Sequence, residues 1–480
     1  MSKEILINAD FQEKRVAIVS DGKLEEYHIE RPTDKTIVGN IYKARIEAVM
    51  TNIGAAFVDI GLDKKGFLYL SEIESIFESV DTSAKITPQQ IKKGQEILVQ
   101  VVKESFGTKG PRLSTHIGIA GRYLVLMPES KQVGISRRIE DDEERRRLRK
   151  LFSELKLPRD VGFIVRTAAR GKSKEELLRD AHFLYKLWKR IDRQSKLKRA
   201  PALIYEEYDL TLRVIRDSFT DDVSKLIVDN KMEYIRIQRF MKTFLQYLAR
   251  KVELYKGDDL FGHKDIERQA NRIFDSHVYL KSKAYIVIEP TEGLVVIDVN
   301  SGGFRKKLGQ EETAFKVNCD AAREIARQLV LRDLGGLVVI DFIDMGKEFY
   351  RREVLKILKN ALSDDRAKYD ILGISKFGLV EITRERVHKT TQMRSYQPCP
   401  YCRGRGKVRS ELTTAIFALK ELSRYLKKKT VKEVNLTLAP VVIDEILKDK
   451  NSLRAIERRF RTKINLISNP IIHIEEVKIS

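Results

Sequence analysis

The sequence has little cysteine and no long apolar run. Its three cysteines are too few for a disulfide framework, so we expect a protein of the reducing cytoplasm. No uncharged apolar segment reaches the roughly 20 residues that a membrane-spanning helix needs, and the N-terminus lacks the apolar core of a signal peptide. Internal repeats and low-complexity segments are also missing, so nothing supports a purely structural, filament-forming role.

The chain has a large excess of positive charge. Its 480 residues contain 91 Lys and Arg against 69 Asp and Glu, a formal net charge of +22. A single hydrophobic core rarely grows beyond about 250–300 residues, so we expect several domains. A charge excess of this size favours a polyanionic partner, nucleic acid before a membrane surface.

Two short apolar segments each end on an aspartate. Residues 295–297 lead to Asp298, and residues 337–340 lead to Asp341. Such β-branched runs, bounded by glycine and turn residues, are typical of buried strands. Between them, residues 311–333 have apolar side chains at helical spacing. A strand, a helix and a strand predict a right-handed parallel crossover, which puts both aspartates at the same, carboxyl, edge of one sheet.

Two carboxylates at one sheet edge form a set of oxygen ligands. With Asn300 beside one of them, they suit Mg²⁺ or Mn²⁺, which indicates metal-assisted phosphate chemistry. The structural alternative is that a strand-end aspartate caps the next loop or helix, and Asp344 also has such a position. Two aspartates of this kind in a strongly basic chain favour metal binding.

Residues 39–116 have the short strands and turn residues of an all-β domain. Expected strands at residues 39–49, 55–60, 66–69 and 96–103 fit a short, five-stranded, partly closed barrel. Phe57 and Phe67 lie on successive strands, with cations nearby at Lys43, Arg45, Lys64, Lys65 and Lys109. Aromatic rings flanked by cations can stack unpaired bases. The two phenylalanines could equally fill the core of the barrel, and their spacing does not decide between these interpretations.

The rest of the chain mixes strands and helices. Strands are expected at residues 4–8, 14–19, 24–29, 123–127, 161–167, 212–215, 285–289, 294–298, 371–375 and 433–438. Helices are expected at residues 140–155, 173–193 and 349–362. Arg166 and Thr167 follow a predicted strand and lie near Gly171, and a guanidinium and a hydroxyl placed in this way could hold a terminal phosphate. This motif alone does not establish such a site.

Cys399 and Cys402 are separated by two residues and followed by glycines. This spacing is typical of a zinc-knuckle turn, and it disfavours a redox motif because the pair does not begin a helix. Structural zinc needs four ligands, and Cys319 belongs to an apolar helical stripe. His388 is a possible ligand, but one histidine leaves the set incomplete. We therefore predict that the same turn of a second chain completes the site, which gives a zinc-bridged homodimer.

Four segments together resemble the ribonuclease E/G family, and the chain length resembles its ribonuclease G branch. They are VVIDVNSGGF at residues 295–304, EETAF at 311–315, GLVVIDFIDM at 336–345 and CPYCRGRG at 399–406. The similarity runs along essentially the whole chain. It implies a cytoplasmic endonuclease that cuts single-stranded RNA, leaves a 5′-phosphate and a 3′-hydroxyl, and acts in rRNA maturation and mRNA decay.

The resemblance also implies roles for individual residues. Asp298 and Asp341 match the metal-binding catalytic carboxylates, and Asn300 supports them. Phe57 and Phe67 fall at the base-stacking positions of the family's RNA-binding OB domain. The positions that sense a 5′-monophosphate are Gly121, Val125, Arg166 and Thr167. Further RNA contacts are implied for Lys109, Arg137, Arg138 and Lys368; the last is arginine in well-studied relatives, so it keeps the charge but loses a bidentate fork.

The implied fold is multidomain α/β. An RNase H-like unit (1–38 and 212–275) is interrupted by an OB-fold barrel (39–117) and a 5′-sensor domain (118–211), and is followed by a DNase I-like catalytic domain (276–395), a zinc link (396–410) and a small α/β domain (411–480). The implied cofactors are catalytic Mg²⁺, with Mn²⁺ as an alternative, and a structural Zn²⁺ shared between subunits. The implied partners are single-stranded RNA and a second copy of the chain, with a dimer of dimers left open.

We hypothesise that Asp298 and Asp341 hold Mg²⁺ beside the scissile phosphate, where it makes the attacking water more acidic and stabilises the developing charge. The barrel would hold bases downstream, and a preference for AU-rich RNA would follow from easy unpairing and stacking. Two rivals remain open from the sequence. One is a non-catalytic RNA chaperone or scaffold in which the aspartates are structural, and the other is a metal-dependent DNase.

Overall fold

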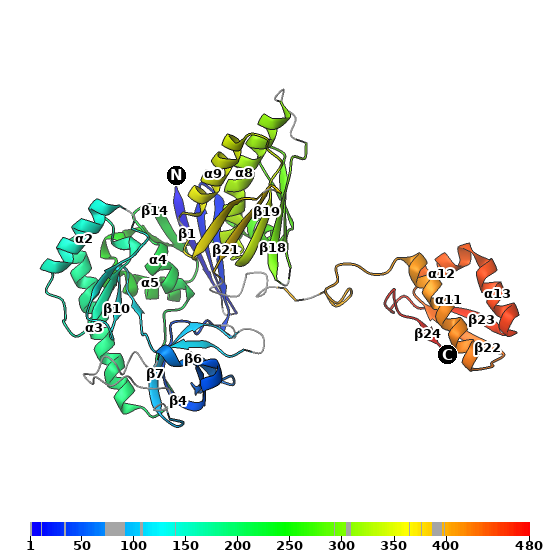
Figure 1. The fold of residues 1–480 in the computed structure, drawn as a ribbon, viewed down its shortest axis with the longest axis horizontal. Helices are drawn as coiled ribbons and strands as arrows, with labels where there is room; N and C mark the ends of the chain where they lie inside the picture. The colour runs from blue at the N-terminus through cyan, green and yellow to red at the C-terminus, as the bar shows by residue number, and fades with distance from the viewer. Residues whose placement is uncertain are drawn as a thin grey trace. The chain divides into compact units, whose positions relative to one another are not determined.

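The computed structural model describes residues 2–10, 12–32, 35–72, 92–105, 109–139, 141–291, 293–303, 309–363, 365–375, 377–385, 396–397 and 399–480. Residues 243, 244 and 450 are described by their backbone alone. The chain divides into two compact units, Met1–Arg394 and Ser395–Ser480 (Figure 1). Within the described ranges, no helix combines the length and the apolar character that crossing a membrane requires.

The first sheet of the larger unit joins two segments that are far apart in the sequence. Its order is β15-β14-β1-β2-β3, with β1 parallel to β14 and antiparallel to β2. The strands are β1 (Lys3–Ala9), β2 (Lys14–Ser20), β3 (Lys23–Glu30), β14 (Val223–Val228) and β15 (Val252–Leu254). Asp21 and Gly22 both have positive φ, as a two-residue hairpin turn requires, and they join β2 to β3 as predicted.

The helices that pack on this sheet include one segment that was predicted as a strand. Among them are α4 (Leu210–Ser218), α5 (Lys231–Phe244), α6 (Leu260–His263) and α7 (Ile266–Asn271), with 3₁₀ turns η5 (Gln246–Lys251) and η6 (Arg272–Phe274). The predicted strand at residues 212–215 is wrong, because these residues lie within α4. Asp209 caps this helix by accepting a hydrogen bond of 3.3 Å from the backbone N–H of Leu212. A short apolar run fits a strand or a buried helix equally well, and here packing against the sheet decided.

A closed five-stranded barrel follows, which confirms the predicted barrel. Its strands are β4 (Ile41–Met50), β5 (Ala55–Asp59), β6 (Gly66–Tyr69), β7 (Glu96–Lys103) and β8 (Arg112–Ser114), with the 3₁₀ turn η2 (Thr51–Ile53). Pairing runs in the order β4-β5-β6-β8-β7 and returns from β7 to β4, so the barrel is closed rather than partly open. The strand β13 (Ala202–Tyr205) adds to the free side of β4.

A four-stranded sheet with two long helices lies between the barrel and β14 in the sequence. Its order is β11-β12-β10-β9. The elements are β9 (Ile119–Ala120), β10 (Leu124–Met127), β11 (Val133–Ile135), α2 (Asp142–Glu154), β12 (Gly162–Val165), the 3₁₀ turn η4 (Thr167–Ala169) and α3 (Lys174–Leu197). A capping box of Ser173 and Glu176 begins α3. Buried aliphatic and aromatic side chains from the sheet and both helices form one core.

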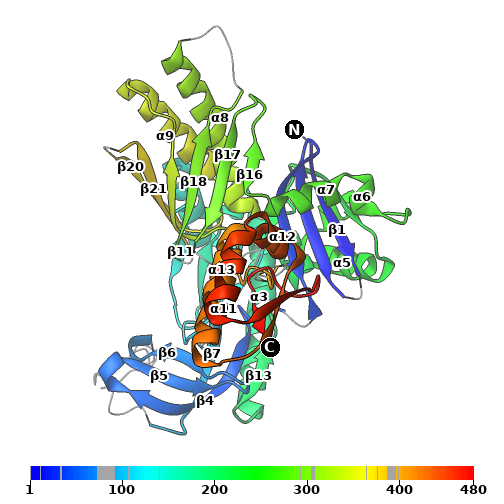
Figure 2. The ribbon, with the colours of Figure 1, turned by 90° about the vertical axis from the view of Figure 1, so that its right-hand side faces the viewer.

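The six-stranded sheet contains the two strands that end on aspartates. Its order is β16-β17-β18-β19-β21-β20, and Figure 2 shows β16, β17 and β18 side by side. The elements are β16 (His277–Tyr279), β17 (Tyr285–Pro290), β18 (Leu294–Asn300), α8 (Gln310–Leu331), β19 (Gly336–Asp341), α9 (Glu348–Leu362), β20 (Tyr369–Ile374) and β21 (Leu379–Arg384). Since β18 and β19 are parallel and α8 connects them, the predicted parallel crossover is confirmed.

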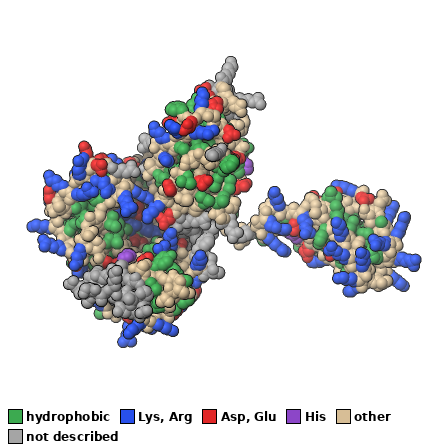
Figure 3. Space-filling view, viewed as in Figure 1, with side chains coloured by type: hydrophobic (Ala, Val, Ile, Leu, Met, Phe, Trp, Pro, Cys, Tyr) green, Lys and Arg blue, Asp and Glu red, His purple; other side chains and the backbone are tan. Residues whose placement is uncertain are grey.

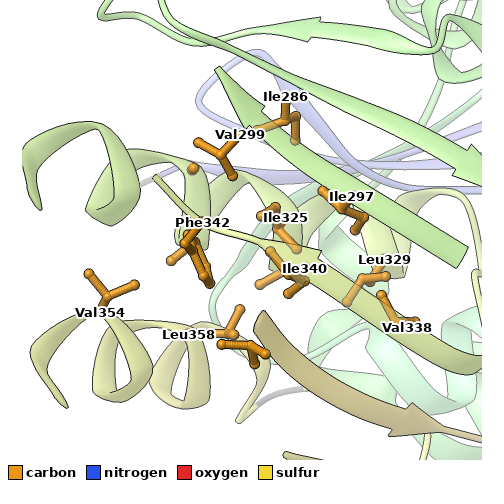
Figure 4. Packing of buried hydrophobic residues seen from close by; sticks show 14 of the residues in the cluster. Ile286, Ile297, Val299, Ile325, Leu329, Val338, Ile340, Phe342, Val354 and Leu358 are labelled. Carbon is orange, nitrogen blue, oxygen red and sulfur yellow. The ribbon is translucent and has the colours of Figure 1, made fainter. Parts of the chain in front are cut away.

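This sheet is covered on one face only. Burial alternates along β18 and β19: Ile297 and Ile340 are fully buried, whereas Val296 and Leu337 are 38% and 39% exposed. The buried side chains pack against α8 and α9, as Figure 4 shows. The predicted burial of these strands therefore holds for one face of the sheet. Both helices lie on the same side, so, as far as the structure describes the chain, the other face remains open.

The smaller unit has a three-stranded sheet and three helices. The sheet order is β23-β22-β24. The elements are α11 (Glu411–Lys428), β22 (Glu433–Leu438), α12 (Pro440–Lys448), α13 (Lys450–Phe460), β23 (Lys463–Ser468) and β24 (Lys478–Ile479). The predicted strand at residues 433–438 is confirmed. The unit has its own core of aliphatic side chains.

Candidate functional site

Asp298 and Asp341 lie side by side on the open face of the six-stranded sheet. They are direct partners in the parallel pairing of β18 and β19, so both side chains point to the same side of the sheet. Both are exposed. The amide Nδ2 of Asn300 donates a hydrogen bond of 2.7 Å to Asp298 Oδ2, which holds that carboxylate in one orientation. The structure thus brings together all three residues of the predicted site.

Within the described part of the chain, the charges that act on Asp341 are those of other aspartates. Burial, followed by the charges of Asp298 and Asp344, raises the pKa of Asp341 above its ordinary value. Carboxylate and amide oxygens are the donors that Mg²⁺ prefers, and Mg²⁺ needs only one or two protein carboxylates because it keeps several waters. Among the described residues, no group of three or more His, Cys, Asp or Glu side chains is placed to hold a metal. The donors present therefore fit a hydrated Mg²⁺ and not a fully protein-ligated ion.

Two side chains of α8 fix the loop that follows Asp341. Asn318, which is fully buried, donates to the carbonyl of Ile343 at 2.8 Å and accepts from the backbone N–H of the same residue at 3.1 Å. Glu311 accepts hydrogen bonds from the backbone N–H groups of Lys347 at 2.8 Å and Gly346 at 3.1 Å, which lower the pKa of its carboxyl. Neither side chain has a role that is predicted from the sequence, although Glu311 begins the EETAF segment.

The barrel carries its predicted aromatic pair on the outside. Phe57 and Phe67 are partners across β5 and β6, both half-buried, with ring centroids 6.1 Å apart. The interior is filled by other, mostly aliphatic residues, so the core-filling alternative is wrong. Tyr69, which the sequence analysis missed, extends the row: its ring centroid lies 5.0 Å from that of Phe67, and Arg112 lies over it at 4.9 Å. An aromatic strip of this kind suits base stacking.

The cations predicted beside these rings differ in their pairing. Lys43 and Arg45 both pair with Glu96, at 3.0 Å and 3.4 Å. Lys65 pairs with Glu47 at 2.7 Å and with Asp59 at 3.3 Å. Lys109 is exposed on the segment that precedes β8.

The four residues predicted to bind a 5′-phosphate lie on neighbouring segments of the four-stranded sheet. The Arg166 guanidinium donates a hydrogen bond of 2.5 Å to the carbonyl of Gly121. Thr167 is exposed and begins η4 directly after Arg166. Val125 pairs with Ile164 across β10 and β12 and is half-buried on the outer face of the sheet. Gly121 and Arg166 are thus in direct contact, with Val125 one strand away.

Two aspartates that the sequence analysis missed support this region. Asp217 pairs with Arg166 at 2.8 Å and with Arg216 at 3.1 Å. Burial opposes ionisation of Asp217, but the charges of Arg216 and Arg166 outweigh it and hold the pKa of this carboxyl well below its usual range. Asp180 is 5% exposed and accepts hydrogen bonds from the backbone N–H groups of residues 122–124. A Cβ at Gly121 would lie 2.7 Å from both oxygens of Asp180, so this approach requires glycine.

The remaining predicted RNA contacts lie beside one loop of the six-stranded sheet. The Arg138 guanidinium donates to the backbone carbonyls of Asp365, Arg366 and Ala367, at 3.2, 2.6 and 3.4 Å. Arg138 therefore connects the sheet of residues 119–165 to this loop. Lys368 follows the loop directly, and both it and Arg137 are exposed.

In the smaller unit, Cys399 and Cys402 lie in a tight turn. The backbone N–H groups of Cys402 and Tyr401, and then the Cys402 thiol, lower the pKa of Cys399 through hydrogen bonds. The backbone N–H of Gly406 lies 3.3 Å from the Cys402 sulfur. The lowered pKa of Cys399 favours the thiolate that zinc requires. His388 lies outside the described residues. In the larger unit, burial raises the pKa of Cys319 to about 11, in agreement with its predicted core position.

Family models match three parts of the chain. The model described as the ribonuclease E/G family matches residues 118–387, and the S1 RNA binding domain matches residues 28–116. A third, described as the RNase E/G thioredoxin-like domain, matches residues 398–480. The S1 match covers the closed barrel and the third matches the smaller unit.

Curated relatives are similar over most of the chain. Ribonuclease G of Haemophilus influenzae is 39% identical over 456 residues, which is 93% of this chain and 92% of that protein. Ribonuclease G of Escherichia coli is 39% identical over 431 residues, or 88% of each chain. Ribonuclease E of Haemophilus influenzae is 40% identical over 475 residues, but these are only 51% of that longer protein.

Proposed function

The chain belongs to the ribonuclease E/G family, and on that basis we propose that Asp298 and Asp341 bind the Mg²⁺ with which this endoribonuclease hydrolyses single-stranded RNA. The observation that carries the proposal is the placement of the two carboxylates as partners on one open sheet face, where burial and then the charge of Asp298 raise the pKa of Asp341. The S1 match and the net charge of +22 support an RNA substrate, and Lys and Arg side chains are spread over the visible face of the larger unit (Figure 3).

The residues at the active site would have separate tasks. Asp298 and Asp341 hold the ion, and Asn300 orients Asp298. Asn318 and Glu311 keep the loop after Asp341 in place. When bound, Mg²⁺ supplies positive charge that stabilises the negative charge growing on the phosphate and makes the attacking water more acidic. The products would carry a 5′-phosphate and a 3′-hydroxyl.

The outer face of the barrel would hold the RNA bases. Phe57 and Phe67, extended by Tyr69, offer rings for stacking, and Lys109 and Arg137 offer exposed positive charge beside the backbone. Stacking accepts every base, so a preference for AU-rich segments would follow from the ease with which they unpair. The same RNA would pass Arg138 and Lys368 at the edge of the catalytic sheet.

A 5′-monophosphate would bind at Arg166 and Thr167, against Gly121 and Val125. The Arg166 guanidinium already pairs with Asp217, so an incoming phosphate has to share it with a carboxylate. A doubly charged terminal phosphate can do so, whereas a 5′-hydroxyl offers no charge. This arrangement favours RNA that carries a 5′-monophosphate.

Cys399 and Cys402 would supply two of the four ligands of a structural zinc, and the same turn of a second chain the other two. The result is a homodimer, which could pair further into a dimer of dimers. Replacing both cysteines by serine should release the zinc and shift the native mass toward the monomer, as light scattering and metal analysis would measure. An unchanged mass with no bound zinc would contradict the bridge.

We assign the domains as the family resemblance implies. The first sheet (residues 1–38 and 212–275) is RNase H-like, residues 39–117 are the OB-fold barrel, residues 118–211 the 5′-sensor domain, residues 276–395 the DNase I-like catalytic domain, residues 396–410 the zinc link and residues 411–480 the small domain. The proposed roles in the cell are rRNA maturation and mRNA decay in the cytoplasm.

One experiment tests the central proposal. A 5′-monophosphorylated AU-rich oligoribonucleotide is incubated with the wild type, Asp341→Asn and Asp370→Asn, with Mg²⁺ or with a chelator. Asp370 is an exposed aspartate on β20, so its variant is a matched control for the loss of one charge. We expect the wild type and Asp370→Asn to cleave the RNA with Mg²⁺, and neither protein to cleave it with the chelator. Cleavage by Asp341→Asn, or by the wild type in the chelator, would overturn the proposal.

A further inference from the structure

Three aromatic side chains gather on the six-stranded sheet at a place that the proposed function does not use. His277 and Tyr279 come from β16 and Tyr285 from β17. The ring centroid of Tyr285 lies 5.7 Å from that of His277 and 5.9 Å from that of Tyr279. Tyr279 is 75% exposed, and His277 is exposed as well.

The cluster lies on the open face, not in the core. Along β17, Ile286 is fully buried on the side of α8, so Tyr285, next to it in the strand, points to the opposite side. Val278 packs against the same core, so His277 and Tyr279 also point away from it. These rings therefore do not serve packing against the helices.

Strand pairing connects the cluster to the carboxylate pair. His277 is aligned with Val287, Val287 with Asp298, and Asp298 with Asp341, in one row across four strands. The next row aligns Tyr279 with Tyr285, and Tyr285 with Asn300. Neighbouring strands lie about 4.8 Å apart. Tyr285 therefore lies one strand from Asn300, and His277 lies two strands from Asp298.

The adjoining loops keep the cluster close to this site and add positive charge. Gly302 has a φ of +53°, and a Cβ there would lie 2.6 Å from the carbonyl oxygen of Lys283 and 3.4 Å from the Tyr285 ring. Glycine thus allows the loop after Asn300 to lie against Tyr285. Lys281 and Lys283 are exposed in the turn between β16 and β17, and neither forms a salt bridge within the part of the chain that the structure describes.

We propose that His277, Tyr279 and Tyr285 form a stacking surface for an unpaired RNA base next to the scissile phosphate, with Lys281 and Lys283 contacting the adjoining backbone. This inference rests on the proposed function of Asp298 and Asp341. Exposed rings beside unpaired cations bind bases of any sequence through their faces, which is what a single-stranded substrate requires. A base held here positions the neighbouring phosphate at the carboxylate pair, so the cluster acts on substrate position and not on the chemical step.

The test uses the full-length Asp341→Asn protein, which should bind RNA without cutting it. A 5′-monophosphorylated RNA carries 2-aminopurine at one of the two positions that flank the wild-type cleavage site. Stacking on the cluster should quench its fluorescence, and adding Tyr279→Ala with Tyr285→Ala should remove most of this quenching. In the active protein, the same two substitutions should lower kcat/KM about tenfold, as expected for the loss of one base stack.

Two controls separate stacking from a general defect. Phe349, 70% exposed on α9 on the helical side of the sheet, serves as a matched aromatic, and Phe349→Ala should leave quenching and kcat/KM unchanged. An RNA with an abasic nucleotide at the quenched position should be cut more slowly by the wild type, and equally slowly by the double variant. If the double variant does not fold, Tyr279→Ala alone provides the test, because its side chain is mostly solvated.

The outcomes distinguish this inference from the function on which it rests. Unchanged quenching and unchanged kcat/KM in the tyrosine variants would overturn the stacking surface and leave the nuclease intact. An additive effect of the abasic nucleotide and the double variant would also overturn it, since the two changes would then act at different places. Cleavage by Asp341→Asn would overturn the proposed function itself.

Discussion

Asp341 and Asp217 are aspartates of the same compact unit in opposite electrostatic surroundings. Asp341 is exposed beside Asp298, and its pKa is raised. Asp217 pairs with Arg166 and Arg216, and its pKa is lowered although its side chain is only 18% exposed. Burial disfavours the charge of both carboxylates, so the neighbouring charges decide the different outcome.

The difference shows which of the two sites needs a bound ligand to balance its charge. Around Asp217 the chain supplies its own counter-charges, so the site is complete without a ligand, and a phosphate can enter only by sharing Arg166. Around Asp341 the charges that raise its pKa, those of Asp298 and Asp344, have the same sign, so a bound cation would stabilise the site. The site at Asp341, whose charge is not balanced by residues that the structure describes, is therefore the better candidate for metal binding. The site at Asp217 and Arg166, whose charges are balanced, is the better candidate for selective recognition of a phosphate.

The largest effect should follow from removing a carboxylate at the Asp341 site. Asp298→Asn should lower kcat on the order of 10³-fold, because Mg²⁺ would lose a ligand next to the reacting phosphate. RNA binding, measured by electrophoretic mobility shift, should persist since the barrel is untouched. Loss of binding together with activity would show that the two aspartates support the fold.

At the Asp217 site, replacing the aspartate by asparagine should mainly lower the stability of the fold. Asp217→Asn removes the counter-charge of Arg166 and one of the two counter-charges of Arg216, which is 8% exposed and also pairs with Glu207; it should lower the free energy of unfolding by about 3 kcal/mol. Thermal unfolding without metal would measure this. Asp341→Asn should cause no such loss, because it relieves a repulsion. Equal destabilisation by both variants would remove the contrast between the sites.

Arg166→Ala should abolish the preference for 5′-monophosphorylated over 5′-hydroxylated RNA. A charge-assisted contact to phosphate contributes about 1.5–3 kcal/mol, so the ratio of the two kcat/KM values should fall by about tenfold or more. Arg170 is a nearby arginine that is largely exposed, and Arg170→Ala is the matched control. If Arg166→Ala keeps this preference, the 5′-monophosphate binds at a different site.

The smallest effect concerns pH. Because the folded-state pKa of Asp217 is lower than its unfolded value of about 3.9, the stability that its ion pairs contribute is complete above roughly pH 4. It is lost as the pH falls through the folded-state value. The difference in melting temperature between the wild type and Asp217→Asn should therefore stay constant from pH 7 to 5 and shrink in stronger acid. A difference that already shrinks above pH 5 would contradict the pairing.

Local patterns predicted the elements that carry the carboxylates. The apolar runs before Asp298 and Asp341, and the helix between them, contained enough information to place both side chains at one edge, since a parallel crossover allows few arrangements. The same runs left open whether helices cover one face of the sheet or two, because an apolar strand does not reveal this. The strand predicted at residues 212–215 is wrong for a related reason. The apolar run is too short for its periodicity to distinguish a helix from a strand.

The supporting side chains could not be predicted from local pattern. Asp180 lies 56–58 positions along the chain from the backbone N–H groups that donate hydrogen bonds to it. Asp217 and Arg166 are likewise distant in the sequence, and Arg138 contacts carbonyls 227–229 positions away. The aromatic cluster is spread over two strands, and nothing in the spacing of His277, Tyr279 and Tyr285 indicates that their rings share a face with Asp298.

The amino-acid sequence by itself determined the chain's strong positive charge, its barrel, its strand–helix–strand unit and the identity of the two carboxylates, because all of these depend on composition or on short-range periodicity. Only the tertiary structure decided which charges are neutralised and which faces stay open. Those properties depend on distances between residues that are far apart along the chain, and Coulomb energies and burial respond to such distances and not to sequence separation.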